Sequence, residues 1–252
     1  GTRRLEDARS GRVFDYRAKD GVYQSFIVGG GGWGGDTSRR AELWNAAEAA
    51  ETRANSCTAR EWILALPHEL THEQRADLVR QIAHDLAERF GVVVDASIHM
   101  PNKEGDQRNY HAHVLMTSRR INDDGTFGAK TRELDDRATG RKVLQEVRGQ
   151  IADRINDALK ASGRAERVDH RTLKAQGVKR AAQVHEGVNA TNARRRNFKT
   201  TPQQEGRKTL REINEEAGAM AAALGIAEQL RVVREQIAAN DRAIGEALAA
   251  QA

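Results

Sequence analysis

The alternation of apolar and polar residues predicts a series of strands in the first half of the chain. Short apolar runs at residues 22–28 and 61–66 are typical of strands, and Pro67 ends the second run. Residues 92–99 and 111–118 are also predicted strands, joined by a polar loop that contains proline and glycine. Residues 29–35 are glycine at all positions but one, which predicts a flexible surface loop.

Apolar residues spaced by three and four predict the helices. Thr71 and Gln74 form a capping-box signature, and Gly91 stands where a helix-ending glycine belongs. Another helix is expected to begin at Asp36 or Thr37. The apolar faces are Leu43, Trp44 and Ala47 in the first helix, Leu78, Ile82, Leu86 and Phe90 in the second, and Leu144, Val147, Ile151, Ile155 and Leu159 in the third. This order of elements predicts an α+β fold, an antiparallel sheet flanked by helices.

The sequence changes character after about Val188. Residues 189–206 hold a basic cluster at 194–196 among polar residues and are expected to form a linker. From 207 to 252 a helical pattern resumes, and Leu230, Ile237 and Ile244 lie seven residues apart. We therefore expect a main domain over residues 1–188 and a C-terminal helical extension, which could pack back on its own domain or form a dimeric coiled coil.

Composition narrows the class of protein without deciding it. Charged residues make up 31% of the 252 residues and the formal charge is +5, consistent with a polyanionic partner. Aromatic residues are only 4%, which argues against a base-stacking platform over a whole sheet. The single cysteine, Cys57, excludes an internal disulfide and suits a reducing cytosol. No signal peptide opens the chain and no run approaches the ~20 apolar residues of a membrane span, so we expect a cytoplasmic protein.

The candidate chemistry lies in three histidines on the last two predicted strands. His111 and His113 are two residues apart, so they project from the same face of their strand. Ala96 and Ile98 alternate with His99 and suit a buried face. If the two strands pair as a hairpin, all three imidazoles share one face of a sheet whose other face is core. Three imidazoles leave coordination positions open for substrate oxygens, as in a catalytic metal site.

Two other interpretations of these histidines are weaker. They could be unrelated, one solvated and two on a polar strand, but the alternation of faces argues against chance. A structural zinc site would need a fourth protein ligand, and Cys57 is the only thiol.

Segments around the histidines resemble the MobA/MobL-type relaxases of plasmid mobilisation. The three-histidine motif is carried by Ser97-Ile-His-Met100 and Asp106-Gln-Arg-Asn-Tyr-His-Ala-His113. Further similar blocks are Arg4-Leu-Glu-Asp-Ala-Arg-Ser-Gly-Arg-Val-Phe-Asp-Tyr16, Ala59-Arg-Glu-Trp-Ile-Leu-Ala-Leu-Pro-His-Glu-Leu70 and Asp169-His-Arg-Thr-Leu-Lys-Ala-Gln-Gly177. They run in consistent order over residues 1–188, which makes the resemblance far more specific than a lone His-x-His.

The resemblance implies a relaxase fold with the histidines on its central strands. It implies that a tyrosine hydroxyl attacks one phosphodiester of single-stranded DNA at an origin of transfer, leaving a reversible 5′-phosphotyrosine link. His99, His111 and His113 would hold one divalent metal ion, Mg²⁺ or Mn²⁺, that polarises the phosphate oxygens. Relaxosome accessory proteins and a type IV coupling protein are the implied partners.

The position of the tyrosine departs from the family pattern. In the family it lies shortly before the segment that resembles the opening of this chain, so we expect it upstream of Gly1, in a strand–helix unit that residues 1–188 lack. Tyr16 is the lesser candidate. Tyr110 stands beside the ligands, but strand alternation turns it to the other face.

Other site residues follow from the same resemblance. Glu61 matches an acidic position of the family and could orient a ligand histidine or accept the tyrosine proton; it could equally be a solvated strand-end residue. Some relatives carry a second glutamate two residues on, where this chain has Ile63. Arg171 lies in a block similar to the family and is a candidate contact to DNA phosphates. Independently of the resemblance, Arg119, Arg120 and Lys130 follow the predicted histidine strand and are further candidates, although such charges are usually only solvated. The basic cluster at 194–196 would strengthen nonspecific binding.

The sequence thus favours a relaxase domain over residues 1–188 that nicks and rejoins DNA, with a linker over 189–206 and a helical tail over 207–252. Two other functions stay open. One is a DNA-binding module without catalysis, and the other is a metal-dependent phosphodiesterase that uses activated water.

Overall fold

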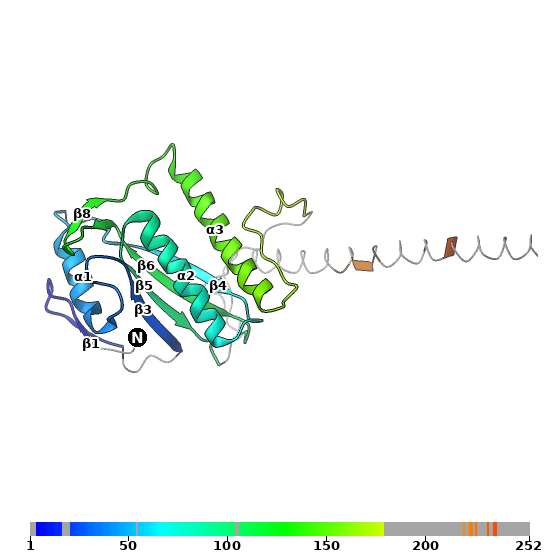
Figure 1. Ribbon diagram of the computed structural model, residues 1–252, viewed down its shortest axis with the longest axis horizontal. Helices are drawn as coiled ribbons and strands as arrows, with labels where there is room; N and C mark the ends of the chain where they lie inside the picture. Colours follow the sequence, from blue (N-terminus) through cyan, green and yellow to red (C-terminus); the bar gives the residue numbers. More distant parts are fainter. Residues whose placement is uncertain are drawn as a thin grey trace, which may run out of the picture. The chain divides into compact units, whose positions relative to one another are not determined.

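The computed structural model describes residues 4–16, 21–53, 55–103 and 106–178, together with single positions between 219 and 235. The chain divides into two compact units, Gly1–His170 and Arg171–Ala252. Figure 1 shows the elements of the first unit. None of the helices that the structure describes combines the length and apolar character needed to cross a membrane.

An antiparallel sheet forms the centre of the first unit. In order across the sheet, its strands are β3 (Val22–Val28), β5 (Val94–His99), β6 (Tyr110–Thr117) and β4 (Ala59–Leu66). Each neighbouring pair is antiparallel. The predicted α+β fold with an antiparallel sheet flanked by helices is confirmed, and the strands that carry the histidines are its central pair.

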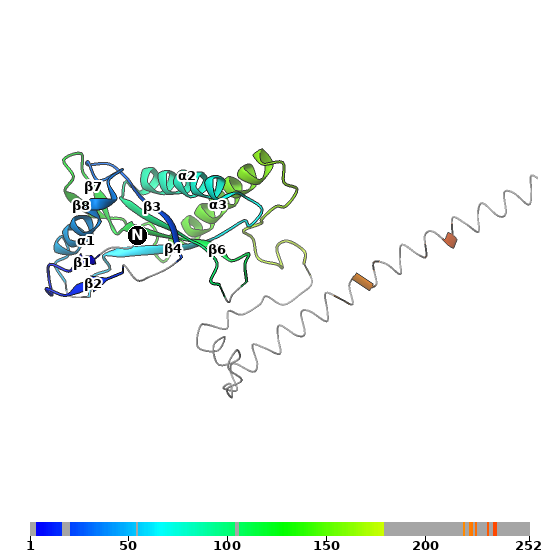
Figure 2. The ribbon, with the colours of Figure 1, turned by 90° about the horizontal axis from the view of Figure 1, so that it is seen from below.

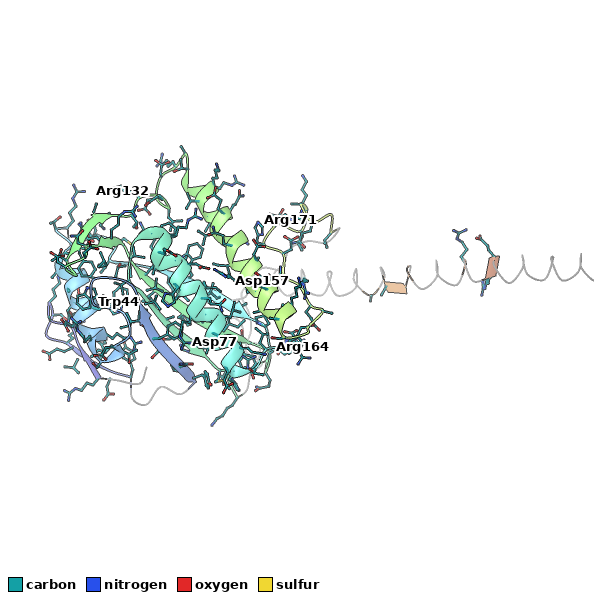
Figure 3. All side chains as sticks on the ribbon, in the orientation of Figure 1. Trp44, Asp77, Arg132, Asp157, Arg164 and Arg171 are labelled. Carbon is teal, nitrogen blue, oxygen red and sulfur yellow. The ribbon has the colours of Figure 1, made fainter. Side chains whose placement is uncertain are left out.

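Two long helices cover one face of this sheet (Figure 2). α2 (His72–Phe90) begins at the predicted capping box and ends at Gly91 in the left-handed conformation, at φ 63°. α3 (Gly140–Ala161) packs beside it. The shared core includes Val79, Ile82 and Phe90 from α2, Ala96, Ile98, Ala112, Val114 and Met116 from the sheet, and Val147, Ile155 and Leu159 from α3. Charged residues such as Asp77 and Asp157 lie on the outer faces of these helices (Figure 3).

Leu144 departs from the predicted apolar face of α3. Its side chain is 40% exposed. The stripe that packs on the core advances in steps of four through Val143, Val147, Ile151 and Ile155. Because successive residues are about 100° apart around a helix, Leu144 stands to one side of this stripe.

A shorter helix covers part of the opposite face. α1 (Arg40–Ala49) follows a 3-10 turn, Thr37–Arg39. Arg40 donates hydrogen bonds of 2.7 and 2.8 Å to the carboxylate of Asp95, and both side chains are buried. Trp44 Nε1 donates to the same carboxylate at 3.0 Å. α1 therefore lies over the start of β5, whereas His99 lies at its end and is partly exposed.

The glycine-rich loop is anchored, contrary to the expectation of a flexible segment. Trp33 is 7% exposed, and its indole Nε1 donates a hydrogen bond of 2.9 Å to the carbonyl of Gly125. Gly31 has a φ of +62°, and a Cβ there would lie 2.6 Å from the Cα of Gly125. The absence of side chains lets two backbone segments approach closely, and glycine content alone does not distinguish this role from flexibility.

Two small hairpins have no counterpart among the sequence predictions. β1 (Arg4–Glu6) pairs with β2 (Val13–Asp15), and β7 (Arg119–Ile121) pairs with β8 (Phe127–Lys130). Both have a turn signal between their strands, Ser10-Gly11 in one and Asp124-Gly125 in the other. Strands this short do not show the alternation that identifies longer ones.

Most of the predicted linker and tail lies outside the described residues. Beyond Val178 the structure describes Ala219, Ala222, Ala223, Gly225, Arg231, Arg234 and Glu235, each of them helical. Arg231 and Glu235 form an ion pair of 2.7 Å, one helical turn apart. The boundaries at residues 188 and 206 stay predictions.

Candidate metal centre

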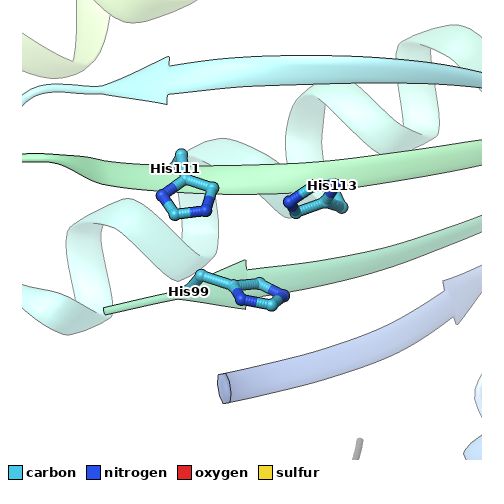
Figure 4. Close-up of side chains that lie close together, drawn as sticks. All are labelled: His99, His111 and His113. Carbon is cyan, nitrogen blue, oxygen red and sulfur yellow. The ribbon is translucent and has the colours of Figure 1, made fainter. Parts of the chain in front are cut away.

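The two central strands bring three histidines together. His99 on β5 is directly opposite His111 on β6, and His113 is opposite Ser97. Figure 4 shows the three rings on one face of the sheet, with the helices behind it. The neighbouring Ile98 is buried in the core. The expectation that the imidazoles share one face while the other face is core is confirmed.

The three rings form a compact cluster. One nitrogen of each ring lies within 4.8 Å of the others, and all three side chains are partly buried. Ring centroids are 5.2 Å apart for His99 and His111, 4.9 Å for His99 and His113, and 5.4 Å for His111 and His113. In the described part of the chain, no other group of three His, Cys, Asp or Glu side chains gathers in this way.

Two of the rings are oriented by acceptors behind them. His111 Nδ1 lies 3.1 Å from the carbonyl oxygen of Asn109, and His113 Nδ1 lies 2.7 Å from Glu61 Oε1. A carbonyl oxygen and a carboxylate oxygen accept hydrogen bonds, so in a neutral imidazole this arrangement places the proton on Nδ1 and leaves the lone pair on Nε2. Glu61 reaches His113 diagonally, because its own ladder partner is Leu115.

This donor set fits a divalent transition-metal ion. Metal–nitrogen bonds of about 2.1 Å hold ligand nitrogens closer together than 4.8 Å, so the rings would turn inward around an ion. Three imidazoles leave positions open for water or substrate oxygens, as in catalytic rather than structural sites. Nitrogen ligands suit Mn²⁺ and the later transition metals better than Mg²⁺, which prefers oxygen.

The tyrosines of the sheet point away from this cluster. Tyr110 packs edge-on against His72, and the guanidinium of Arg75 lies 3.6 Å from the centre of its ring. Tyr23 also packs against His72, with ring centroids 4.9 Å apart. Both contacts are to α2, which covers the face opposite the histidines, as alternation predicts for Tyr110. Tyr16 follows β2 and stacks on Phe14 at 6.4 Å.

Two of the predicted DNA contacts are engaged inside the domain. Arg119 and Lys130 form ion pairs of 2.9 Å with Glu51, whose side chain is only 5% exposed. Burial alone would raise the pKa of Glu51, but hydrogen bonds from Lys130, Arg119 and Ser56 outweigh it and hold the pKa below its ordinary value. These cations lie beyond the end of β6, whereas the histidines lie near its start.

The other two predicted DNA contacts also lie on segments other than the strands of the histidines. Arg120 donates to the carbonyl of Phe90 at 2.9 Å and pairs with Glu133. Arg171 begins the second compact unit. Two residues near the histidines escaped the sequence predictions: Asn109, which orients His111, and Ile63, which is 64% exposed opposite His113. The available signal for Asn109 was its position two residues before His111, whereas the pairing of Ile63 with His113 depends on the register of β4 and β6, which the sequence does not give.

Comparison with known proteins places the chain in a family. The model of the MobA/MobL family matches residues 1–196. Mobilization protein MobL of Acidithiobacillus ferridurans is 34% identical over 218 residues, covering 76% of this chain and 57% of the relative. The 43 kDa relaxation protein of Salmonella typhimurium is 38% identical over 161 residues, covering 55% and 42%. This chain therefore spans about half the length of these relatives.

A solved structure shares the fold of this chain. The structure described as the molecular basis of vancomycin resistance transfer in Staphylococcus aureus superposes with a TM-score of 0.57 and 27% sequence identity, covering 68% of this chain and 86% of that one. The family model and the relatives point to the same group, and the chain belongs to the MobA/MobL family.

Proposed function

We propose that this chain is the DNA-processing part of a relaxase, which nicks and rejoins single-stranded DNA at an origin of transfer. The observation that carries the proposal is the cluster of His99, His111 and His113, with the Nδ1 atoms of two rings held by acceptors. Membership of the MobA/MobL family and the similarity to a relaxation protein support it.

The proposed reaction would use a divalent ion, the side chain of Glu61 and the hydroxyl of a tyrosine. A divalent ion, Mn²⁺ in preference to Mg²⁺, would withdraw charge from the non-bridging oxygens of the scissile phosphate. Glu61 holds the ring of His113 in the orientation that leaves Nε2 for the ion. The attacking oxygen would belong to a tyrosine, and Tyr16 is the lesser candidate within these residues. Because one phosphodiester replaces another, rejoining is the reverse step and needs no ATP.

Metal binding is the first test. Calorimetric titration of the chain with Mn²⁺ is expected to show about one site, and His111→Ala is expected to weaken it severely because one of three ligands is lost. His84→Ala, on the outer face of α2, is the matched control and should bind as the unmodified chain does. Equal binding by the His111 variant would remove the basis of the proposal.

The products of the reaction separate the proposal from its rivals. The protein in its longest natural form is incubated with Mn²⁺ and a single-stranded oligonucleotide from its own origin of transfer. A relaxase gives a covalent adduct through a tyrosine and a free 3′-hydroxyl, and peptide mapping identifies the tyrosine. A phosphodiesterase that uses water gives cleaved DNA without an adduct, and a binding module gives a complex without cleavage.

The contacts to DNA and to other proteins remain proposals. Arg119, Arg120, Lys130 and Arg171 could contact phosphates, although the first three already have acidic partners. Accessory proteins and a coupling protein would assemble on the complete relaxase. DNA affinity should fall as salt rises, because phosphate contacts release counterions.

A further inference from the structure

The open part of the histidine face is apolar along its outermost strand. Among the strands that the structure describes, β4 lies at the edge of the sheet and is paired only with β6. On the histidine side it presents Glu61, Ile63 and Ala65, and only the first of these is polar. Ile63 is 64% exposed, the highest value among the large apolar side chains of the described residues. The solvent face of an antiparallel sheet is usually polar.

Ile63 stands beside the metal ligands. It is the ladder partner of His113, and directly opposed residues place their Cβ atoms about 4.5–5.5 Å apart. Ala65 is likewise the partner of His111. A group bound at the cluster would therefore have an aliphatic surface next to it, toward the edge of the sheet.

The other half of the same face is closed by α1. There Leu43 and Ile27 belong to one buried apolar cluster. The carboxylate of Asp95 accepts hydrogen bonds from Arg40 and Trp44. An aliphatic side chain left exposed beside a polar metal centre suits a ligand that has polar and apolar parts at short range. A nucleotide is such a ligand, because its phosphate is anionic and the faces of its base are apolar. Extruded bases are held by stacking on apolar side chains.

We propose that Ile63 contacts the base of the nucleotide that flanks the phosphate at the histidine cluster. This inference rests on the proposed function, because it assumes that single-stranded DNA is bound there. The contact is to a base rather than to a phosphate, so it adds affinity that does not depend on counterion release. The contact would also accept any of the four bases, because every base has an apolar face.

The experiment compares two probes on the full chain. Fluorescence anisotropy measures binding of a twelve-nucleotide thymidylate strand and of an abasic strand of the same length, in the presence of Mn²⁺. Ile63→Ser is expected to weaken binding of the thymidylate strand about three- to tenfold and to leave binding of the abasic strand unchanged. Ile63→Phe is expected to tighten binding of the thymidylate strand alone, because an aromatic ring stacks better on a base.

Control variants and outcomes separate this inference from the proposed function. Val168→Ser changes an apolar side chain that is 40% exposed and lies after α3, and it should bind both strands as the unmodified chain does. Equal Mn²⁺ binding by the Ile63 variants would show that the centre is intact. Undiminished binding of the thymidylate strand by Ile63→Ser, or an equal loss for both strands, would overturn the base contact alone. Failure of the unmodified chain to bind either strand would overturn the DNA-binding part of the proposed function as well.

Discussion

The contact of Glu61 with His113 indicates the role of Glu61 in the site. Its carboxylate lies 2.7 Å from His113 Nδ1, and its side chain is 45% exposed. Carboxylates in this position fix the tautomer of a ligand histidine and raise its basicity. A proton acceptor for a nucleophile would instead have to reach the attacking oxygen directly. The hydrogen bond to His113 therefore favours the orienting role.

Replacing Glu61 tests this role. Glu61→Gln should keep the fold and lower the affinity for Mn²⁺ by about ten- to a hundredfold, because the amide supports the His113 tautomer less well than a carboxylate does. Calorimetric titration measures the change, and Glu6→Gln on the exposed strand β1 is the matched control. Any loss of nicking should recover partly with excess metal.

A second outcome would reassign Glu61. If nicking fell without recovery in excess metal, and the loss shrank as pH approached the free tyrosine pKa of roughly 10, Glu61 would be the proton acceptor. Unchanged metal binding and unchanged nicking would leave it a solvated strand-end residue.

At the scale of elements, the glycine-rich loop and the β7–β8 hairpin hold each other in place. Gly31 contacts the turn of the hairpin, where a Cβ would lie 2.6 Å from both the Cα of Gly125 and a methyl group of Ile121. Gly32 also has a positive φ, +73°, but has nothing within 4 Å of a Cβ. A comparison of substitutions at Gly31 and Gly32 therefore distinguishes the cost of a left-handed backbone conformation from the cost of close packing.

Alanine at these two positions should have unequal effects. Gly32→Ala is expected to lower the free energy of unfolding by about 1 kcal/mol, the cost of a left-handed conformation for a residue with a Cβ. Gly31→Ala should cost about 1–3 kcal/mol more, because the methyl group overpacks the hairpin turn. Urea denaturation followed by tryptophan fluorescence measures both. Equal losses would mean that the loop yields and is flexible after all.

Prediction from sequence succeeded where a periodic signal was long. The nineteen-residue helix α2 combines a capping box, a four-residue repeat and a terminal glycine, and all three are present in the structure. The face shared by the histidines followed from strand alternation together with the assumption that the two strands pair as a hairpin. Contacts between distant segments were not predictable in this way: Trp33 is buried because Gly125 lies beside it, and Glu51 is buried because Arg119 and Lys130 surround it.

At the scale of the whole molecule, Glu51 joins segments that are far apart in sequence. It lies just after α1, and its two cationic partners come from β7 and β8. Lys130 also donates to the carbonyl of Cys57 at 2.9 Å, in the segment that leads into β4. The contact between these three segments therefore depends on the Glu51 carboxylate remaining ionised.

The pH dependence of stability should reveal this carboxylate. Because the pKa of Glu51 is lower in the folded chain than its ordinary value, its ionised form stabilises the fold above the unfolded pKa of about 4.3, and this contribution is lost as pH falls through the folded pKa. Glu51→Gln should thus lower the free energy of unfolding by about 3 kcal/mol at pH 7, since two cations lose their partner, and by progressively less below pH 4. Urea denaturation at several pH values measures the difference.

Glu48→Gln is the control: it removes the more exposed ion pair with Arg9, at 3.0 Å, and should lower the free energy of unfolding by under about 1 kcal/mol. A loss for Glu51→Gln that stays constant between pH 7 and pH 3 would mean that packing, and not charge, is what Glu51 contributes to the fold.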